Sequence, residues 1–124
     1  MSKVFFSYTR RDNTITKEFL KKLKNDIPKD KIETFIDLLD NKSSKKQKEV
    51  FNQLSTSNLM IVIQTDSTYE SEWVNAELNL AKQKKIPTYI LGFKDICKFV
   101  NSIKVDDLEN VLKDKNLFLR TINI

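Results

Sequence analysis

Histidine is absent from this chain of 124 residues, and the sequence has one cysteine and one glycine. Without histidine, neither a Ser-His-Asp triad, a Cys-His pair nor a histidine-based metal site can form. The lone Cys97 excludes an intrachain disulfide and argues against zinc and iron–sulfur sites, so we expect no metal. The lone Gly92 excludes glycine-rich phosphate-binding loops. Any chemistry must therefore use carboxylates, hydroxyls, tyrosine, lysine or arginine.

Long hydrophobic runs are also missing. No apolar stretch approaches the ~18 residues that span a bilayer, and the N-terminal stretch lacks the apolar segment of a signal peptide. We therefore expect a cytoplasmic protein with no membrane partner. The net charge is +5, but lysines are spread along the chain without a nucleic-acid recognition motif, so we expect no nucleic-acid partner. The length and the 40% hydrophobic content fit one compact domain.

Apolar runs alternate with helical patterns along the chain. Strands are expected at 3–7, 31–37, 58–64 and 86–91, and helices at 14–26, 44–54, 71–85, 95–102 and 106–113. Thr14 or Asn13 is expected to cap the first helix and Ser44 the second. Residues 116–124 either pair as an edge strand or end as a tail. This alternation predicts an α/β fold with a parallel sheet and helices on both faces.

Polar side chains follow the predicted strands where the strands end. They are Tyr8, Thr9, Arg10 and Arg11 after the first strand, Asp37 after the second, and Thr65, Asp66 and Ser67 after the third. Because ligands of such folds bind outside the carboxyl ends of the parallel strands, this edge of the sheet is the predicted location of a site.

Glu77 breaks the pattern of the helix expected at 71–85. On a helical wheel, Trp73, Val74, Leu80 and Ala81 all fall within about 60° of Glu77, so a carboxyl group is centred in the apolar face. Burying an unpaired carboxylate is costly and raises its pKa. Either a lysine or arginine neutralises Glu77, or it faces a cleft with a function.

Three segments resemble the Toll/interleukin-1 receptor (TIR) family: KVFFSYTRRD at 3–12, FID at 35–37 and SNLMIVIQTDSTYESEWVNAEL at 57–78. The resemblance implies one TIR-like domain over 1–124, with its core at about 2–92 and with C-terminal helices and a possible edge strand at 93–124. It implies a flavodoxin-like three-layer sandwich with a mostly parallel sheet of four or five strands in the order 2-1-3-4-5. The loop after the second strand lacks the family's usual glycine, which argues against receptor-type adaptor contacts.

The resemblance also implies two possible activities. Some TIR domains signal by self-association, and others cleave the nicotinamide–ribose bond of NAD with a glutamate four residues after a tryptophan or cysteine. Here Glu77 follows Trp73 at that spacing and is the expected catalytic residue. NAD is then a substrate, and no prosthetic group is expected. A small free-standing chain is similar to bacterial TIR proteins of Thoeris-type antiphage defence, which make a signal that a separate effector senses.

Seven further residues are candidates for binding NAD: Phe6, Tyr8, Arg10, Arg11, Asp37, Ser71 and Trp73. Aromatic rings can stack on the cofactor, and the arginines can meet the pyrophosphate. Each also has an ordinary structural interpretation, such as core packing for Phe6 and helix capping for Ser71. Two other functions stay open: a non-catalytic TIR interaction module, and a deoxyribosyltransferase-like enzyme acting on nucleosides.

Overall fold

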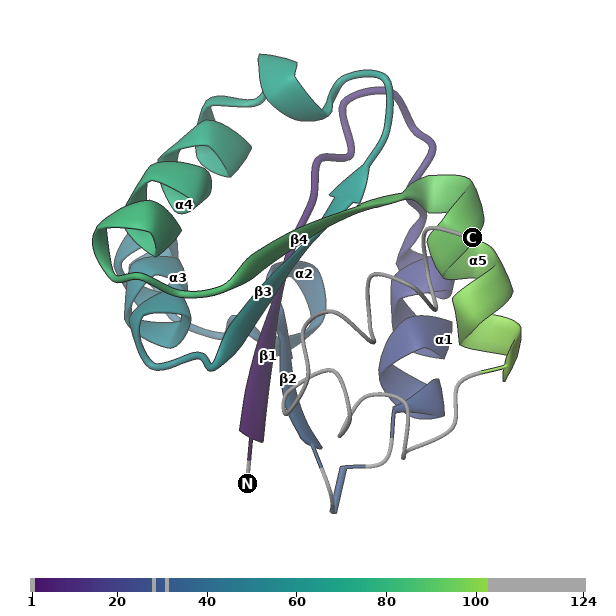
Figure 1. Cartoon of the computed structure of the whole chain (residues 1–124), viewed down its shortest axis with the longest axis horizontal. Coiled ribbons are helices and arrows are strands. Elements are labelled where there is room, and N and C mark those ends of the chain that lie inside the picture. The colour runs from purple at the N-terminus through teal and green to yellow at the C-terminus, as the bar shows by residue number, and fades with distance from the viewer. Residues whose placement is uncertain (1, 28, 31, 103–124) are drawn as a thin grey trace.

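The computed structural model describes residues 2–27, 29–30 and 32–102 (Figure 1). Four strands form one sheet in the order β2-β1-β3-β4, with every pairing parallel. They are β1 (Ser2–Ser7), β2 (Ile32–Ile36), β3 (Leu59–Gln64) and β4 (Thr88–Gly92). This confirms the predicted parallel α/β fold and the first four positions of the predicted order. The helix expected at 106–113 and the possible fifth strand at 116–124 lie outside the described residues.

Helices cover both faces of the sheet (Figure 1). They are α1 (Lys17–Asp26), α2 (Asp37–Asp40), α3 (Lys46–Ser55), α4 (Glu72–Gln83) and α5 (Phe93–Ser102), with a short 3₁₀ turn η1 (Thr68–Glu70) before α4. One layer contains α1 and α5, and the opposite layer contains α3 and α4. In the described part of the chain, every helix is too short or too polar to cross a membrane.

Alternation along β1 assigns its side chains to the two layers. Val4 and Phe6 belong to the hydrophobic core under α1, whereas Phe5 belongs to the core under α3 and α4. Successive side chains of a strand point to opposite faces, so Ser7 shares the α3/α4 face with Phe5. The last residue of β1 therefore places a buried hydroxyl, rather than a hydrocarbon, under α4.

The strand order changes direction between β1 and β3. The chain leaves β1 toward α1 on one face of the sheet and leaves β3 toward α4 on the other. This divergence opens a crevice at the carboxyl ends of the two strands, where ligands of open α/β sheets bind.

The start of α1 differs from the prediction. Thr16, rather than Thr14 or Asn13, caps the helix, because its Oγ1 accepts a hydrogen bond of 3.1 Å from the amide of Phe19. The amide of Thr14 instead donates to Asp12 Oδ1 at 3.1 Å, and Asn13 has a positive φ of 61°. A turn built on Asp12 thus occupies the predicted first turn and delays the helix.

The predicted loop at 38–46 also contains regular structure. It begins within α2, whose end is fixed because Asn41 donates from its amide to Asp37 O at 3.0 Å and from Nδ2 to Asp37 Oδ1 at 2.7 Å. The expected cap at Ser44 is wrong, because α3 starts later and Lys45 stands at its cap position without a side-chain hydrogen bond. This loop is therefore ordered by Asn41, a residue the sequence pattern did not single out.

Candidate functional site

A pocket of about 240 Å³ opens at the carboxyl end of β1, between the residues after β2 and the first half of α4. Its lining residues are Phe6, Tyr8, Thr9, Arg10, Asp37, Leu38, Val50, Ser71, Trp73 and Glu77. Seven of the eight predicted site residues therefore line one pocket. Arg11 is the exception.

Glu77 is buried, with 6% of its surface exposed, between Val74 and Ala81 on the inner face of α4. Ser7 Oγ donates a hydrogen bond of 3.0 Å to Glu77 Oε1, and both groups are buried. Among the described residues, no lysine or arginine lies within ion-pair distance of Glu77. Of the two interpretations of the wheel, the structure therefore supports a carboxyl group facing a cleft.

The environment of Glu77 disfavours its charged form. Burial raises the pKa of Glu77 to about 8, the hydrogen bond from Ser7 opposes this rise, and the charge of Asp37 adds to it. A carboxyl group with such a pKa is largely protonated at neutral pH. A positive charge beside it would favour ionisation, so the pocket is electrostatically suited to a cationic group.

Tyr8 joins the segments that follow β1 and β2. Its hydroxyl accepts a hydrogen bond of 3.0 Å from the amide of Leu38, and burial raises the pKa of Tyr8 to about 12. The phenol therefore keeps its proton at neutral pH. Asp37 and Glu77 both act on Tyr8 electrostatically, which places the three acidic side chains around one space.

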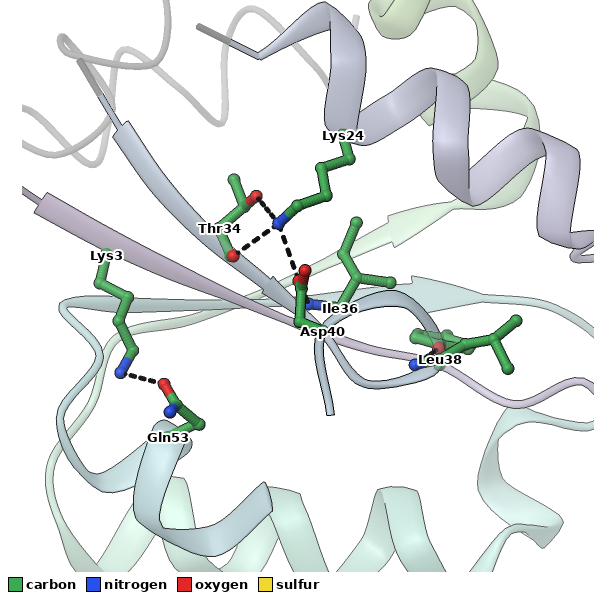
Figure 2. Close-up of polar contacts among 8 residues, drawn as sticks. Lys3, Lys24, Thr34, Ile36, Leu38, Asp40 and Gln53 are labelled. Carbon is green, nitrogen blue, oxygen red and sulfur yellow. Dashed lines mark hydrogen bonds and ion pairs between the residues drawn. The ribbon is translucent and has the colours of Figure 1, made fainter. Parts of the chain in front are cut away.

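Lys24 of α1 helps to fix the segment after β2. Asp40 Oδ2 accepts hydrogen bonds from the amide of Ile36 and from Lys24 Nζ, both at 2.8 Å. Figure 2 shows Lys24 reaching from α1 to this carboxylate and to Thr34, whose Oγ1 it meets at 3.0 Å. These contacts hold α2 against the end of β2, so Asp37 is presented to the pocket on an ordered turn.

The two arginines after β1 bind backbone carbonyls. Arg11 lies outside the pocket lining, and its guanidinium donates to Glu70 O at 2.7 Å. Arg10 lines the pocket, but its Nε donates to Ile15 O at 3.3 Å. The structure gives no support to Arg11 as a pyrophosphate ligand, because this side chain bridges to η1 instead.

Asp12, like Arg11, connects the loop after β1 to the loop after β3. Its Oδ2 accepts from the amide of Ser67 at 3.0 Å and its Oδ1 from the amide of Thr14 at 3.1 Å. Together with a hydrogen bond from Thr65, these contacts hold the pKa of Asp12 well below its usual range. Asp12 and Arg11 therefore clasp the β1–α1 loop to the β3–α4 loop at the edge of the crevice.

Trp73, Ser71 and Phe6 have different roles in the structure. Trp73 belongs to the apolar arc of the helical wheel, but in the structure it is 47% exposed and lines the pocket. Ser71 caps α4 by accepting from the amide of Val74 at 3.3 Å, as expected. Phe6 touches the pocket, but its side chain is buried in the core beneath α1.

A parallel sheet in the order 2-1-3-4, with helices on both faces and a carboxyl-lined pocket at its carboxyl edge, defines the flavodoxin-like class of α/β domains. A family model for the TIR domain matches residues 4–112, and the chain belongs to that family. Comparisons with curated proteins and with solved structures gave no match. The TIR family includes NAD-cleaving enzymes and modules that self-associate, so membership alone leaves the activity to be argued from the pocket.

Proposed function

We propose that this TIR domain cleaves the nicotinamide–ribose bond of NAD with Glu77 as the catalytic residue. The observation that carries the proposal is a buried carboxyl group that no cation neutralises among the described residues, in a pocket at the switch point of the sheet. Membership of the family supports the assignment, because the glutamate stands one helical turn after Trp73.

The charges of the pocket suit this substrate. The nicotinamide ring of NAD is cationic, and breaking the bond between its nitrogen and ribose C1′ places positive charge on the ribose in an oxocarbenium-like transition state. The nicotinamide leaves as a neutral molecule with the bonding electron pair. Ionised Glu77, aided by the nearby charge of Asp37, stabilises the positive ribose in surroundings that screen the charge poorly.

The pocket volume sets how much of NAD it can enclose. Pockets that enclose a drug-sized ligand measure about 300–1,000 Å³, so a pocket of about 240 Å³ accommodates one end of a dinucleotide. We place the nicotinamide riboside end inside, because this end carries the cation. The remainder would lie over the mouth, where Leu38 is 38% and Trp73 47% exposed and the indole ring is available for stacking.

Water as the acceptor gives ADP-ribose, and an acceptor within the substrate gives a cyclic ADP-ribose-type product. We further propose a cytoplasmic role in bacterial antiphage defence, in which the domain self-associates and its product signals to a separate effector. This wider proposal rests on membership of the family.

The direct test is mass spectrometry of NAD incubated with concentrated protein, which should reveal nicotinamide and ADP-ribose or its cyclic isomer. Glu77→Ala and Glu77→Gln should abolish product formation while far-UV circular dichroism stays that of the wild type. Glu72→Gln is the matched control, because it removes a carboxylate from an exposed position of the same helix and should leave the rate unchanged. Wild-type protein that releases no nicotinamide, even when concentrated, would refute the proposal.

A non-catalytic interaction module is the second candidate, and the exposed apolar side chains at the pocket mouth favour it. That function predicts that Glu77→Gln preserves self-association, whereas Trp73→Ala weakens it. Sedimentation of the two variants distinguishes this role from catalysis. Release of free base from deoxynucleosides but not from NAD would instead indicate the deoxyribosyltransferase-like reaction.

A further inference from the structure

The two oxygens of the Glu77 carboxyl group have different surroundings. Oε1 accepts the hydrogen bond from Ser7 Oγ at 3.0 Å. Oε2 has no hydrogen-bond partner among the described residues, and it is accessible to solvent. Since Glu77 lines the pocket, Oε2 is the oxygen that opens onto it.

Ser7 is held in place by the pairing of β1 with β3. It is fully buried at the end of β1, and its Cα is paired in register with Val62 of the neighbouring strand β3. Its side chain shares the α3/α4 face with Phe5, as the alternation of a strand requires. The hydroxyl is therefore attached to a buried residue of the paired sheet, whereas Glu77 reaches it from the helix layer.

We propose that Ser7 is a positioning residue for Glu77: its hydroxyl holds Oε1 and so turns Oε2 toward the substrate. This proposal rests on the proposed function only for the identity of the substrate. A hydroxyl that donates to Oε1 leaves Oε2 to carry the proton when the acid is neutral. Ser7 thereby assigns the exchangeable proton of neutral Glu77 to the oxygen that faces the pocket.

Few other groups can set the ionisation of Glu77. Asp37, after β2, and Tyr8, after β1, are the acidic groups that face it, and Arg10 faces Tyr8. The lining residue from α3 is Val50, which is apolar. Among the described residues, Ser7 thus supplies the hydrogen bond that favours the ionised form. Removing the Ser7 hydroxyl should therefore raise the pKa of Glu77.

The test is a carbon-13 NMR titration of the Glu77 carboxyl group in the full chain without substrate. Ser7→Ala should raise the pKa of Glu77 by about one unit, because a hydrogen bond that favours the ionised form is lost. Ser7→Thr, which keeps the hydroxyl, should return the pKa toward the wild-type value. Ser7→Cys keeps the size of the side chain but donates weakly, and it should shift the pKa as Ser7→Ala does.

Ser57→Ala is the matched control. Ser57 is also a buried serine, but its hydroxyl donates to Gln53 O at 2.8 Å just before β3, at the opposite end of the sheet from the pocket. Its loss should affect stability without changing the titration of Glu77. A pKa of Glu77 that is the same in Ser7→Ala, Ser7→Cys and wild type would overturn the proposal.

Kinetics then separate the two proposals. With NAD at pH 7, Ser7→Ala should lower kcat/KM about tenfold and displace its pH profile toward higher pH, as the raised pKa requires. Ser57→Ala should keep the wild-type profile. If the wild type cleaves no NAD, the proposed function fails, but the NMR titration still decides whether Ser7 positions Glu77. If NAD is cleaved and the Ser7→Ala profile is unmoved, Ser7 is not a positioning residue.

Discussion

Replacing Glu77 by glutamine should stabilise the protein even as it removes the proposed activity. Glutamine keeps the shape of the side chain and an oxygen that accepts from Ser7. In the folded protein, burial raises the pKa of Glu77 from 4.5 to about 8. The folded state therefore holds a proton that the unfolded chain has released between these two pH values. Stability falls as the pH rises through this window and levels off above pH 8, because both states are then ionised.

The size of the effect follows from the two pKa values. Each tenfold change in the dissociation constant corresponds to about 1.4 kcal/mol, so moving the pKa from 4.5 to about 8 costs the folded state at most about 5 kcal/mol at high pH. This is a large fraction of the ~5–15 kcal/mol that stabilises a typical domain. We expect Glu77→Gln to gain several kcal/mol over the wild type at about pH 9 and much less at about pH 5.

Urea unfolding followed by circular dichroism from about pH 5 to about pH 9 measures this difference. Glu72→Gln is the control, since it changes the same residue type at an exposed position in the first turn of α4. Losing this favourable charge at the helix N-terminus should destabilise the control by about 0.3–1 kcal/mol, opposite in sign to Glu77→Gln. If the gain of Glu77→Gln over wild type does not grow with pH, the carboxyl group is not strained by burial and the reasoning is refuted.

Three further predictions concern the pocket and its loops. The kcat/KM for NAD should rise with pH through about 8, because ionised Glu77 stabilises the positive ribose; a flat profile would contradict this role. Asp12→Asn should lower the midpoint of thermal unfolding at neutral pH and weaken the fall of this midpoint in acid. The lowered pKa of Asp12 stabilises the fold above pH 3.8, and this contribution is lost as the pH falls further. Asp66→Asn, at an exposed position, should match the wild type. Tyr8→Phe should speed hydrogen exchange at the Leu38 amide, whose acceptor it removes, and unchanged protection would show that the amide has another partner.

The fold was predictable because its signals are local. Residues 59–63 form a continuous apolar run, which is typical of a central parallel strand, and β3 contains all of these positions. The anomaly at Glu77 was also visible locally, as a carboxyl group centred in an apolar arc, and the structure shows it buried. Both features follow from the spacing of apolar residues within a single segment of the sequence.

Contacts between distant segments were not predictable in the same way. Asp12 meets the amide of Ser67 across 55 positions, and Arg11 meets Glu70 O across 59, so no local pattern marks either pair. The same reason explains why Ser7 was missed: the sequence shows a small polar residue at the end of a strand, and only the packing of α4 on β1 gives that residue a partner.

Seventy positions separate Ser7 from Glu77, and the hydrogen bond between them exists only when β3 has paired with β1 and α4 has packed across the pair. The pocket therefore cannot form in a growing chain until α4 has been synthesised. A fragment that ends before α4 contains most of the lining residues but lacks Glu77. An activity of the proposed kind would be absent from chains that lack α4 and from unfolded chains, so the topology would tie the consumption of NAD to a folded domain that includes α4.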